Sequence, residues 1–341
     1  MLELAAALVP RLRAGERVAV ITVTAVARSA PRGVGSSMAV TAGGEVIGSI
    51  SGGCVEEDAV MLGLRALSYG SGLAASFGFT DEAAHAAGLA CGGAIEVVAY
   101  PLSGEDDVAV AALEAALRDE PTALGLVVRD GAAAPLGTLL PVPAEDAVLT
   151  LSHAPRARLV ILGAGDHAAA LCRVAAAAGF AVNVCDGWGL LVTPERFPDA
   201  DRLVVQAPDQ YLRASADEFD ARTAICVLTH DERVDIPALA VALRLPVAFV
   251  GAMGARSTVE RRSGMLREAG IGDDELARLH SPLGLDLGGE SPEETAVSIL
   301  AEIIAARRAG SGLPLRALST PIHGDPIGSL SCAAPRIGER A

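Results

Sequence analysis

Apolar residues in residues 1–154 form short runs with either strand-like or helix-like spacing. Residues 17–27 are rich in Val, Ile and Thr, which is typical of a buried strand. Residues 37–50 suit two short strands joined by a tight turn at Gly43 and Gly44. Further strands are predicted at residues 92–100, 122–130 and 136–142, and helices at residues 1–16, 55–69 and 105–120. This mixture predicts an α+β domain.

Strands alternate with helices from residue 157 onward. Residues 158–188 predict a strand, a glycine turn, a helix and a second strand, and more short strands are predicted within residues 202–206, 223–231 and 246–255. This order predicts a Rossmann-like, doubly wound parallel sheet. We therefore expect an α/β protein with three parts: an α+β domain at residues 1–154, a Rossmann-like domain at residues 155–309 and a mobile tail at residues 310–341.

The last predicted helix carries clear end signals. Ser291 can cap its first turn, Pro292 suits the first helical position, and Glu294 completes a capping box. Gly310 is expected to end the helix.

Composition excludes several classes of function. The formal charge of −15 argues against a nucleic-acid or anionic-membrane surface, because both favour clustered Lys and Arg. No segment approaches ~18 uninterrupted apolar residues, so we expect no transmembrane helix and a cytoplasmic protein. The six cysteines include no CxxC pair, which counts against a zinc ribbon, a thioredoxin-like site or an iron–sulfur cluster. Free thiols are therefore expected.

The glycine turn after residue 162 resembles a phosphate-binding motif. Gly163 permits the tight turn, Gly165 lets backbone approach a phosphate, and Ala168 lets helix and strand pack closely. Asp186 follows the second strand, where a carboxylate can accept hydrogen bonds from ribose hydroxyls. Asp166 would repel a phosphate if it pointed at one. The motif therefore predicts a nucleotide-like ligand, and a Rossmann fold that serves only as a docking surface stays the alternative.

Three glycine loops border strands of the first domain, at residues 29–38, 49–58 and 89–96. If they converge, they form a concave site rich in backbone N–H donors that suits a large polar anion. Arg32 could add bidentate contacts to a phosphate. The candidate binding residues in the other two loops are Gly52, Gly53, Cys54, Cys91 and Gly92.

Cys54 allows three interpretations: a functional wall or ligand, a small buried residue, or a redox thiol. A helix starting at Cys54 would lower its pKa, whereas the adjacent Glu56 and Glu57 would raise it. The sequence leaves these alternatives open. Cys91 shares the functional interpretation, whereas Cys172, Cys185 and Cys226 fall inside a predicted helix or strands and are expected in the core.

His230 lies just beyond a predicted strand, at the edge where open α/β sheets bind ligands. Together with Asp231 it is a candidate acid–base pair, and its alternative role is a turn residue before a helix. No HxH or HExxH spacing occurs, so we predict no metal site made by the protein alone.

The assembled motifs resemble the xanthine dehydrogenase accessory family, also called the XdhC/CoxI family. In the first domain the resemblance rests on "SAPRGVGSSMAV", "GSISGGCVEEDAV" and "CGGAIEV". In the second it rests on "LVILGAGDHAAALCRVAAAAGFAVNVCDGW", "VLTHDERVDIPAL" and "FVGAMGARSTVERR". Arg256 belongs to the last motif and is a further candidate binding residue. Where the family often has an Asp-x-Arg, this chain has Asp186-Gly187-Trp188, so a basic contact is missing and indole stacking could replace it.

The resemblance implies a chaperone that binds the molybdenum cofactor (molybdopterin or its dinucleotide form), holds it during sulfuration and helps insert it into an enzyme. The implied partners are an apo molybdenum hydroxylase and a cysteine desulfurase, and a homodimer fits the family. Cys54 would then contact or shield the molybdenum, since soft sulfur suits it. Two alternatives stay open: an NAD(P)-dependent oxidoreductase with His230 as proton donor, and an adaptor that only docks desulfurase and apoenzyme.

Overall fold

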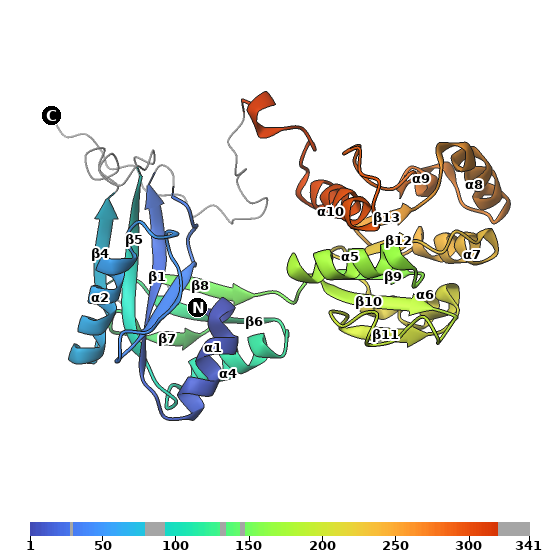
Figure 1. Cartoon of the computed structure of the whole chain (residues 1–341). Coiled ribbons are helices and arrows are strands. Elements are labelled where there is room, and N and C mark those ends of the chain that lie inside the picture. The colour runs from blue at the N-terminus through green and yellow to red at the C-terminus, as the bar shows by residue number, and fades with distance from the viewer. Residues whose placement is uncertain (28–29, 79–92, 130–133, 144–146, 320–341) are drawn as a thin grey trace. The chain divides into compact units, whose positions relative to one another are not determined.

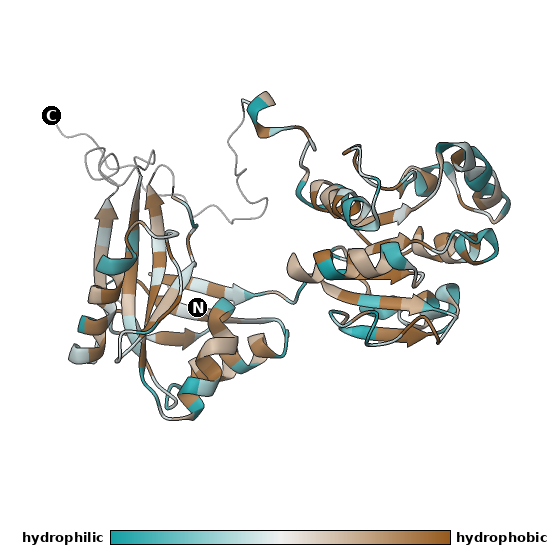
Figure 2. Ribbon diagram, viewed as in Figure 1, coloured by the Kyte–Doolittle hydropathy of each residue, from teal (hydrophilic) through white to brown (hydrophobic). Residues whose placement is uncertain are grey.

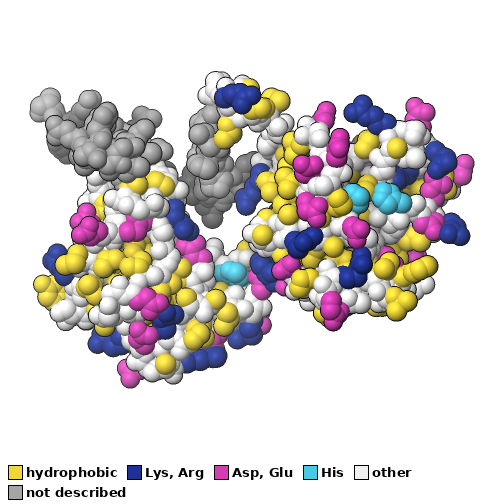
Figure 3. All heavy atoms as spheres, viewed as in Figure 1, with side chains coloured by type: hydrophobic (Ala, Val, Ile, Leu, Met, Phe, Trp, Pro, Cys, Tyr) yellow, Lys and Arg dark blue, Asp and Glu magenta, His cyan; other side chains and the backbone are white. Residues whose placement is uncertain are grey.

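The protein forms two compact units, Met1–Pro155 and Arg156–Ala341 (Figure 1). The structure is a computed structural model that describes residues 1–27, 30–78, 93–129, 134–143 and 147–319. Hydrophobic residues run along the strands of both units and along the helix faces packed on them (Figure 2). Acidic and basic side chains are interspersed on the visible face of each unit (Figure 3).

The first unit is built on a five-stranded antiparallel sheet in the order β3-β2-β1-β5-β4. Its strands are β1 (Val18–Ala27), β2 (Ser37–Thr41), β3 (Val46–Gly48), β4 (Leu73–Gly78) and β5 (Ala94–Leu102). A smaller antiparallel sheet has the order β7-β6-β8, from β6 (Thr122–Val127), β7 (Leu139–Pro141) and β8 (Val148–His153).

Helices cover both faces of the five-stranded sheet. On one face α2 (Glu56–Tyr69) buries Ala59, Leu62 and Ala66 against β1, β2 and β5. On the other face α1 (Ala5–Arg13) and α4 (Asp107–Leu117) share a core with the small sheet, preceded by the short 3-10 helix η1 (Leu2–Leu4). The predicted strands and helices of this unit are confirmed, and β4 and β8 are additional strands.

The second unit holds six parallel strands in the order β11-β10-β9-β12-β13-β14. They are β9 (Arg158–Leu162), β10 (Ala181–Asp186), β11 (Arg202–Val205), β12 (Ala224–Val227), β13 (Phe249–Ala252) and β14 (Leu279–His280). Numbered along the chain this order is 3-2-1-4-5-6, which is the Rossmann order. The predicted α/β fold with a Rossmann-like domain is therefore confirmed.

Both faces of the parallel sheet are covered. One face packs on α5 (Asp166–Ala177) and α10 (Pro292–Arg308), and the other on α6 (Pro208–Ala214), α7 (Glu232–Ala242) and α8 (Arg256–Glu268). The remaining short helices are η2 (Ala216–Glu218), α9 (Asp273–Leu276) and η3 (Leu315–Ala317). Because the order of strands reverses between β9 and β12, the carboxyl ends of these strands flank the crevice where such sheets bind ligands.

The ends of α10 confirm one sequence prediction and correct another. Ser291 caps the helix and forms the predicted capping box with Glu294. At the other end the left-handed residue is Ala309, with φ 53°, whereas the sequence predicts that the glycine at residue 310 takes that role. The amide of Gly310 donates to the carbonyl of Ala305 at 2.8 Å, so the helix closes one residue earlier than predicted.

Candidate functional site

The glycine turn between β9 and α5 lies at the crevice. Gly163 has a φ of +113°, and a Cβ atom there would lie 3.0 Å from the carbonyl carbon of Leu228 and 3.1 Å from the nitrogen of Thr229. Gly165 is the N-cap of α5, and a Cβ atom there would meet nothing within 4 Å. Ala168 is fully buried, as close packing of helix and strand requires. Gly163 thus allows the tight turn and the close approach of the backbone at Leu228 and Thr229. Gly165 leaves an open surface at the start of α5.

Asp186 joins this turn to the end of β10. One carboxylate oxygen accepts the N–H of Ala164 at 3.0 Å and the other accepts the N–H of Trp188 at 2.9 Å. Arg196 donates to the carbonyl oxygen of Ala164 at 3.1 Å and lies 3.4 Å from the carboxylate of Asp166. The structure therefore supplies a basic group that the sequence motif after β10 lacks. Arg196 lies in an irregular segment without periodicity, so no sequence signal could have located it.

An aromatic surface adjoins the turn. The side chain of Trp188 is 72 % exposed at the carboxyl end of β10, and the neighbouring Leu190 and Val205 are also exposed. Planar heterocycles stack on such exposed aromatic faces. Together with Asp186 and Arg196, this surface brings an exposed aromatic ring, a carboxylate and a guanidinium to the glycine turn and the end of β10.

An open pocket of about 570 Å³ continues the same edge past β12. We call it the α7–α8 pocket; its lining consists of His230, Asp231, Glu232, Arg233, Asp235, Gly254, Ala255, Thr258, Arg261 and Arg262. His230 is exposed at its mouth with a φ of 60°, a left-handed conformation that is uncommon for a residue other than glycine. Because Thr229 lies against the glycine turn, the pocket and the turn are parts of one continuous edge.

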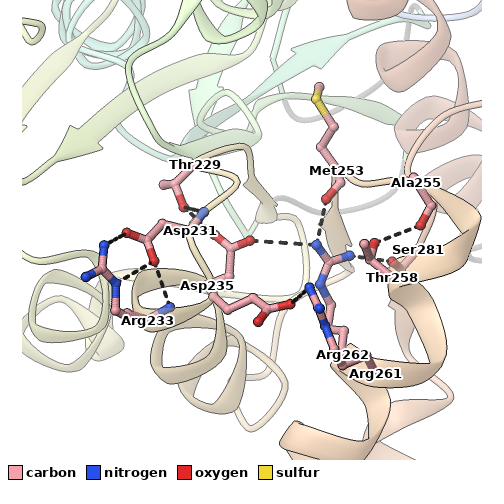
Figure 4. A network of polar contacts seen from close by, with 11 residues as sticks. Thr229, Asp231, Arg233, Asp235, Met253, Ala255, Thr258, Arg261, Arg262 and Ser281 are labelled. Atoms are coloured by element: carbon pink, nitrogen blue, oxygen red, sulfur yellow. Dashed lines mark hydrogen bonds and ion pairs between the residues drawn. The ribbon is translucent and has the colours of Figure 1, made fainter.

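A buried ion pair, Asp235 with Arg262, lies among the residues that line the α7–α8 pocket (Figure 4). Asp235 is 2 % exposed and Arg262 is 5 % exposed, with 3.7 Å between carboxylate and guanidinium. Arg262 also donates to the carbonyl oxygen of Met253 and to the hydroxyl of Ser281, both at 2.7 Å. The hydroxyl of Thr229 donates to Asp235. Burial raises the pKa of Asp235, and the Thr229 hydroxyl and Arg262 oppose that rise.

The contacts of Arg262 connect three segments of the chain. Asp235 belongs to the start of α7, Met253 follows β13 and Ser281 follows β14, so Arg262 ties together segments that are distant in the sequence. Arg256, a predicted binding residue, is the exposed first residue of α8 and does not line the pocket. The basic lining comes from Arg233, Arg261 and Arg262, which sequence reasoning had not singled out.

His230 and Asp231 do not form the acid–base pair that the sequence suggested. Asp231 is the N-cap of α7 and accepts the amide of Arg233 at 3.0 Å, and its carboxylate pairs with the Arg233 guanidinium at 2.7 Å. These contacts lower the pKa of Asp231. The buried carboxylate nearby is Asp235: burial raises its pKa, and the charge of His230 is among the smaller effects that oppose this rise.

The loop before α2 holds a carboxylate at its centre. Both oxygens of Glu56 accept hydrogen bonds from the loop that precedes it. The donors are the amides of Ser51 at 2.9 Å, Gly52 at 3.0 Å, Gly53 at 2.8 Å and Val55 at 3.2 Å, and the hydroxyls of Ser49 and Ser51. Burial would raise the pKa of Glu56, but these hydrogen bonds outweigh it and lower the pKa to about 2.

Cys54 is part of the same turn and packs against the core. Its side chain is half-buried and packs, together with Ala30, against the cluster that contains Ile50 and Val55. Its amide donates to the hydroxyl of Ser51 at 3.0 Å, and α2 begins two residues later, at Glu56. The structure therefore brings parts of the first two glycine loops to the same core, but the N–H donors expected to face an external anion point at Glu56.

The remaining predicted binding residues of the first unit are Arg32, Cys91 and Gly92. Arg32 pairs with the carboxylate of Glu3 at 3.0 Å, and Glu3 also accepts the amide of Ser37 at 3.0 Å. Cys91 and Gly92 lie outside the described residues. Ala27 pairs with Ala94, so the end of β1 and the start of β5, which border the first and third loops, lie side by side.

The other described cysteines are buried, as predicted. Burial raises the pKa of Cys172 to about 11 and that of Cys185 to about 12, and it raises the pKa of Cys226 still further. Within the described ranges, no three His, Cys, Asp or Glu side chains gather as a metal ion would require. Among the described helices, none combines the length and apolar character needed to cross a membrane.

Comparison with known families gives matches in both units. A model of the XdhC Rossmann domain matches residues 159–303, and a model of the XdhC and CoxI family matches residues 11–78. Together they cover more than half of the chain. A solved structure described as a xanthine dehydrogenase from Bacillus halodurans has a TM-score of 0.74 with 22 % identity, over 89 % of this chain and 96 % of that one. That likeness supports the fold of both units.

Curated relatives extend the match along the chain. A Bacillus subtilis protein named as a probable xanthine dehydrogenase subunit is 28 % identical over 86 % of this chain and 94 % of its own length. The molybdenum cofactor insertion chaperone PaoD of Escherichia coli is 25 % identical over 88 % of this chain and 86 % of its own length. The uncharacterized protein YqeB of Escherichia coli is 34 % identical, but the match spans only 29 % of YqeB. The chain belongs to the XdhC and CoxI family.

Proposed function

We propose that this protein is a maturation factor that carries the molybdenum cofactor, as cargo, to an apo molybdenum hydroxylase. The observation that carries the proposal is the continuous edge of the Rossmann-like unit, which offers separate places for the parts of a long phosphate-bearing ligand. The relative named as a molybdenum cofactor insertion chaperone, which aligns over 88 % of this chain, supports the identity of the cargo.

Each part of the edge suits one chemical part of the cargo. The open start of α5 and the guanidinium of Arg196 would bind a phosphate. Asp186 can accept from a ribose hydroxyl with its remaining lone pairs, and Trp188 would stack on a base. The α7–α8 pocket beyond His230 has room for the part of the molecule that follows the phosphate. This division suits a dinucleotide form of the cofactor.

The finer parts of the proposal concern sulfur. We expect the half-buried thiol of Cys54 to contact or shield the molybdenum while a cysteine desulfurase sulfurates the cofactor. The carrier would then act as a homodimer that docks the desulfurase and the apoenzyme in turn. In this scheme the protein binds and orients, and the bond-making chemistry belongs to the desulfurase.

Cargo loading tests the role of Cys54. When the protein is co-expressed with the cofactor pathway, the wild type is expected to co-purify with pterin, which is detected by fluorescence after oxidation. Cys54→Ser should carry at least about threefold less molybdenum per pterin, because a hydroxyl is a harder and weaker ligand for the metal. Cys172→Ala, which changes a buried cysteine of α5, is the matched control and should load normally. Equal loading of Cys54→Ser and the wild type would leave Cys54 a packing residue.

An NAD(P)-dependent oxidoreductase is the second candidate, and the Rossmann strand order favours it. Trp188 is the single tryptophan of the chain and is exposed at the proposed base position, so its fluorescence reports directly on ligands that stack there. Tight quenching by NAD⁺ with hydride transfer to a substrate would favour the oxidoreductase. Tight pterin binding without turnover would favour the carrier.

Stacking on Trp188 gives a second expected result. Nucleoside diphosphates should quench Trp188 fluorescence, and Trp188→Leu should weaken their binding, measured by calorimetry, by about 1–3 kcal/mol, since that is the usual contribution of one stacked base. Val297→Ala, which removes an exposed side chain of α10 that has no part in the proposed site, serves as control and should bind normally. Unchanged affinity in Trp188→Leu would remove the base position from the proposal.

A further inference from the structure

The centre of the 49–55 turn is the place where glycine-rich loops commonly bind an external anion. Here the anion is part of the chain. Four amides and two hydroxyls of the turn donate to the carboxylate of Glu56, at distances that include 2.6 Å from the Ser49 hydroxyl and 2.8 Å from the Gly53 amide. Gly52 and Gly53, with φ of +79° and +117°, let successive amides converge on one point.

The carboxylate is held there by two physical effects. Glu56 is the first residue of α2, so its charge also interacts favourably with the positive end of the helix dipole. It is tethered close in sequence to all its donors, which gives an effective concentration that no free phosphate in solution matches. The hydrogen bonds keep the pKa of Glu56 at about 2, and the group is therefore ionised at any physiological pH.

An oxyanion that approached the turn would find its donors used and a negative charge in their place. The outer face of the turn is open, because Cβ atoms at Gly52 and Gly53 would meet nothing within 4 Å. What this face can offer a ligand is backbone without side chains and the adjacent half-buried thiol of Cys54. The turn is therefore poor at binding phosphate and well suited to bring a flat ligand close to sulfur.

We propose that Glu56 is a specificity-determining residue: it occupies the anion position of the 49–55 turn, so that the turn presents the Cys54 thiol to the cargo and excludes its phosphate. This inference rests on the proposed function for the identity of the cargo. It assigns phosphate recognition to the second unit, where the start of α5 is open and Arg196 adds a guanidinium. Taken by itself, the 49–55 turn of the first unit favours the metal-bearing end of a cargo over its phosphate.

The charge at the turn can be measured with two alkylating reagents of the same reactivity class. In the full-length protein, the rate at Cys54 is followed by mass spectrometry with anionic iodoacetate and with neutral iodoacetamide. Glu56→Gln should raise the ratio of the iodoacetate rate to the iodoacetamide rate about threefold, because a unit charge beside the thiol is lost. General loosening of the turn would raise both rates equally and leave the ratio unchanged.

Glu57→Gln is the matched control, since it removes the same charge from the next residue. Glu57 is exposed and its carboxylate is not the one that the turn surrounds. Its ratio should change by less than half as much. Equal ratios in Glu56→Gln and Glu57→Gln would overturn the proposal, because the position of the carboxylate would then be irrelevant.

A second arm uses inorganic phosphate as the probe. In Glu56→Ala the emptied turn should bind phosphate, so millimolar phosphate should slow the alkylation of Cys54 at least about threefold, whereas the wild type should be unaffected. Phosphate protection of the wild type to the same extent would contradict the proposal. Circular dichroism shows whether Glu56→Ala folds. If it does not, the effect of phosphate on alkylation of the wild type and the ratio of alkylation rates in Glu56→Gln still test the proposal.

The outcome is separable from that of the proposed function. Both arms use the protein without cargo and small reagents, so they report on the turn alone. Absence of pterin from the co-expressed wild type would overturn the carrier function and leave the role of Glu56 at the turn intact. Normal pterin loading together with phosphate protection of the wild type would overturn the role of Glu56 and leave the carrier function intact.

Discussion

Replacing Arg262 by methionine is expected to destabilise the second unit by about 3–5 kcal/mol at pH 8. The substitution leaves Asp235 as a buried carboxylate without its cation, and it leaves the Met253 carbonyl and the Ser281 hydroxyl without a donor. Denaturant unfolding followed by Trp188 fluorescence measures this unit specifically, because Trp188 is the single tryptophan of the chain. The double variant Asp235→Asn with Arg262→Met should recover part of the loss, since no charge is then buried alone.

The loss in Arg262→Met should also depend on pH. Burial already raises the pKa of Asp235 above its ordinary value, and removal of the guanidinium raises it further. A carboxyl group whose pKa is higher in the folded state than in the unfolded state costs no folding stability below the unfolded pKa. The free energy of unfolding then falls as pH rises through the folded pKa. The difference between variant and wild type should therefore be smaller at pH 5 than at pH 8.

Arg261→Met is the matched control for this prediction. Arg261 is the next residue along α8 and pairs with Glu232 at the surface, where such pairs contribute roughly 0–1 kcal/mol. If Arg262→Met costs no more than Arg261→Met, the buried pair does not hold the loops of the α7–α8 pocket together.

Gly163→Ala is expected to cost about 2–4 kcal/mol of unfolding free energy. The residue has a φ of +113°, which strains any side chain, and the new methyl would lie 3.0–3.1 Å from backbone atoms of Leu228 and Thr229. Backbone atoms cannot rotate away as a flexible side chain can, so β9 and the loop after β12 must separate. The same Trp188-detected unfolding measures the loss.

Gly165→Ala separates binding from stability. Gly165 has an ordinary φ of −78°, and a Cβ atom there meets nothing within 4 Å, so unfolding should change by less than about 0.5 kcal/mol. The added methyl occupies the open surface at the start of α5, where a phosphate would approach, and nucleoside diphosphates should bind at least about tenfold more weakly. Normal binding by Gly165→Ala would place the phosphate elsewhere.

Local patterns were sufficient to predict most of the elements. β-branched runs such as those of β1 and β9 and the capping box at Ser291 and Glu294 act within a few residues, and the structure confirms them. Strand β4 was missed because it is a six-residue edge strand whose side chains are only half-buried on one face. The parallel, doubly wound character of the second sheet followed from the regular alternation of strands with helices, whereas the order of its strands came from the structure.

The sequence by itself determined the two-part organisation of the motifs and the Rossmann-like turn at Gly163, and it predicted a functional role for the loop around Cys54. Only the tertiary structure decided which groups meet. It brings Arg196 to the Ala164 carbonyl, and Arg262 to Asp235, contacts that no local spacing encodes. It also changed the role assigned to Glu56. From the sequence alone, this residue was considered only as a charge that would raise the pKa of Cys54. Folding turns the carboxylate back onto its own loop, because six converging donors stabilise a charge more than water does there.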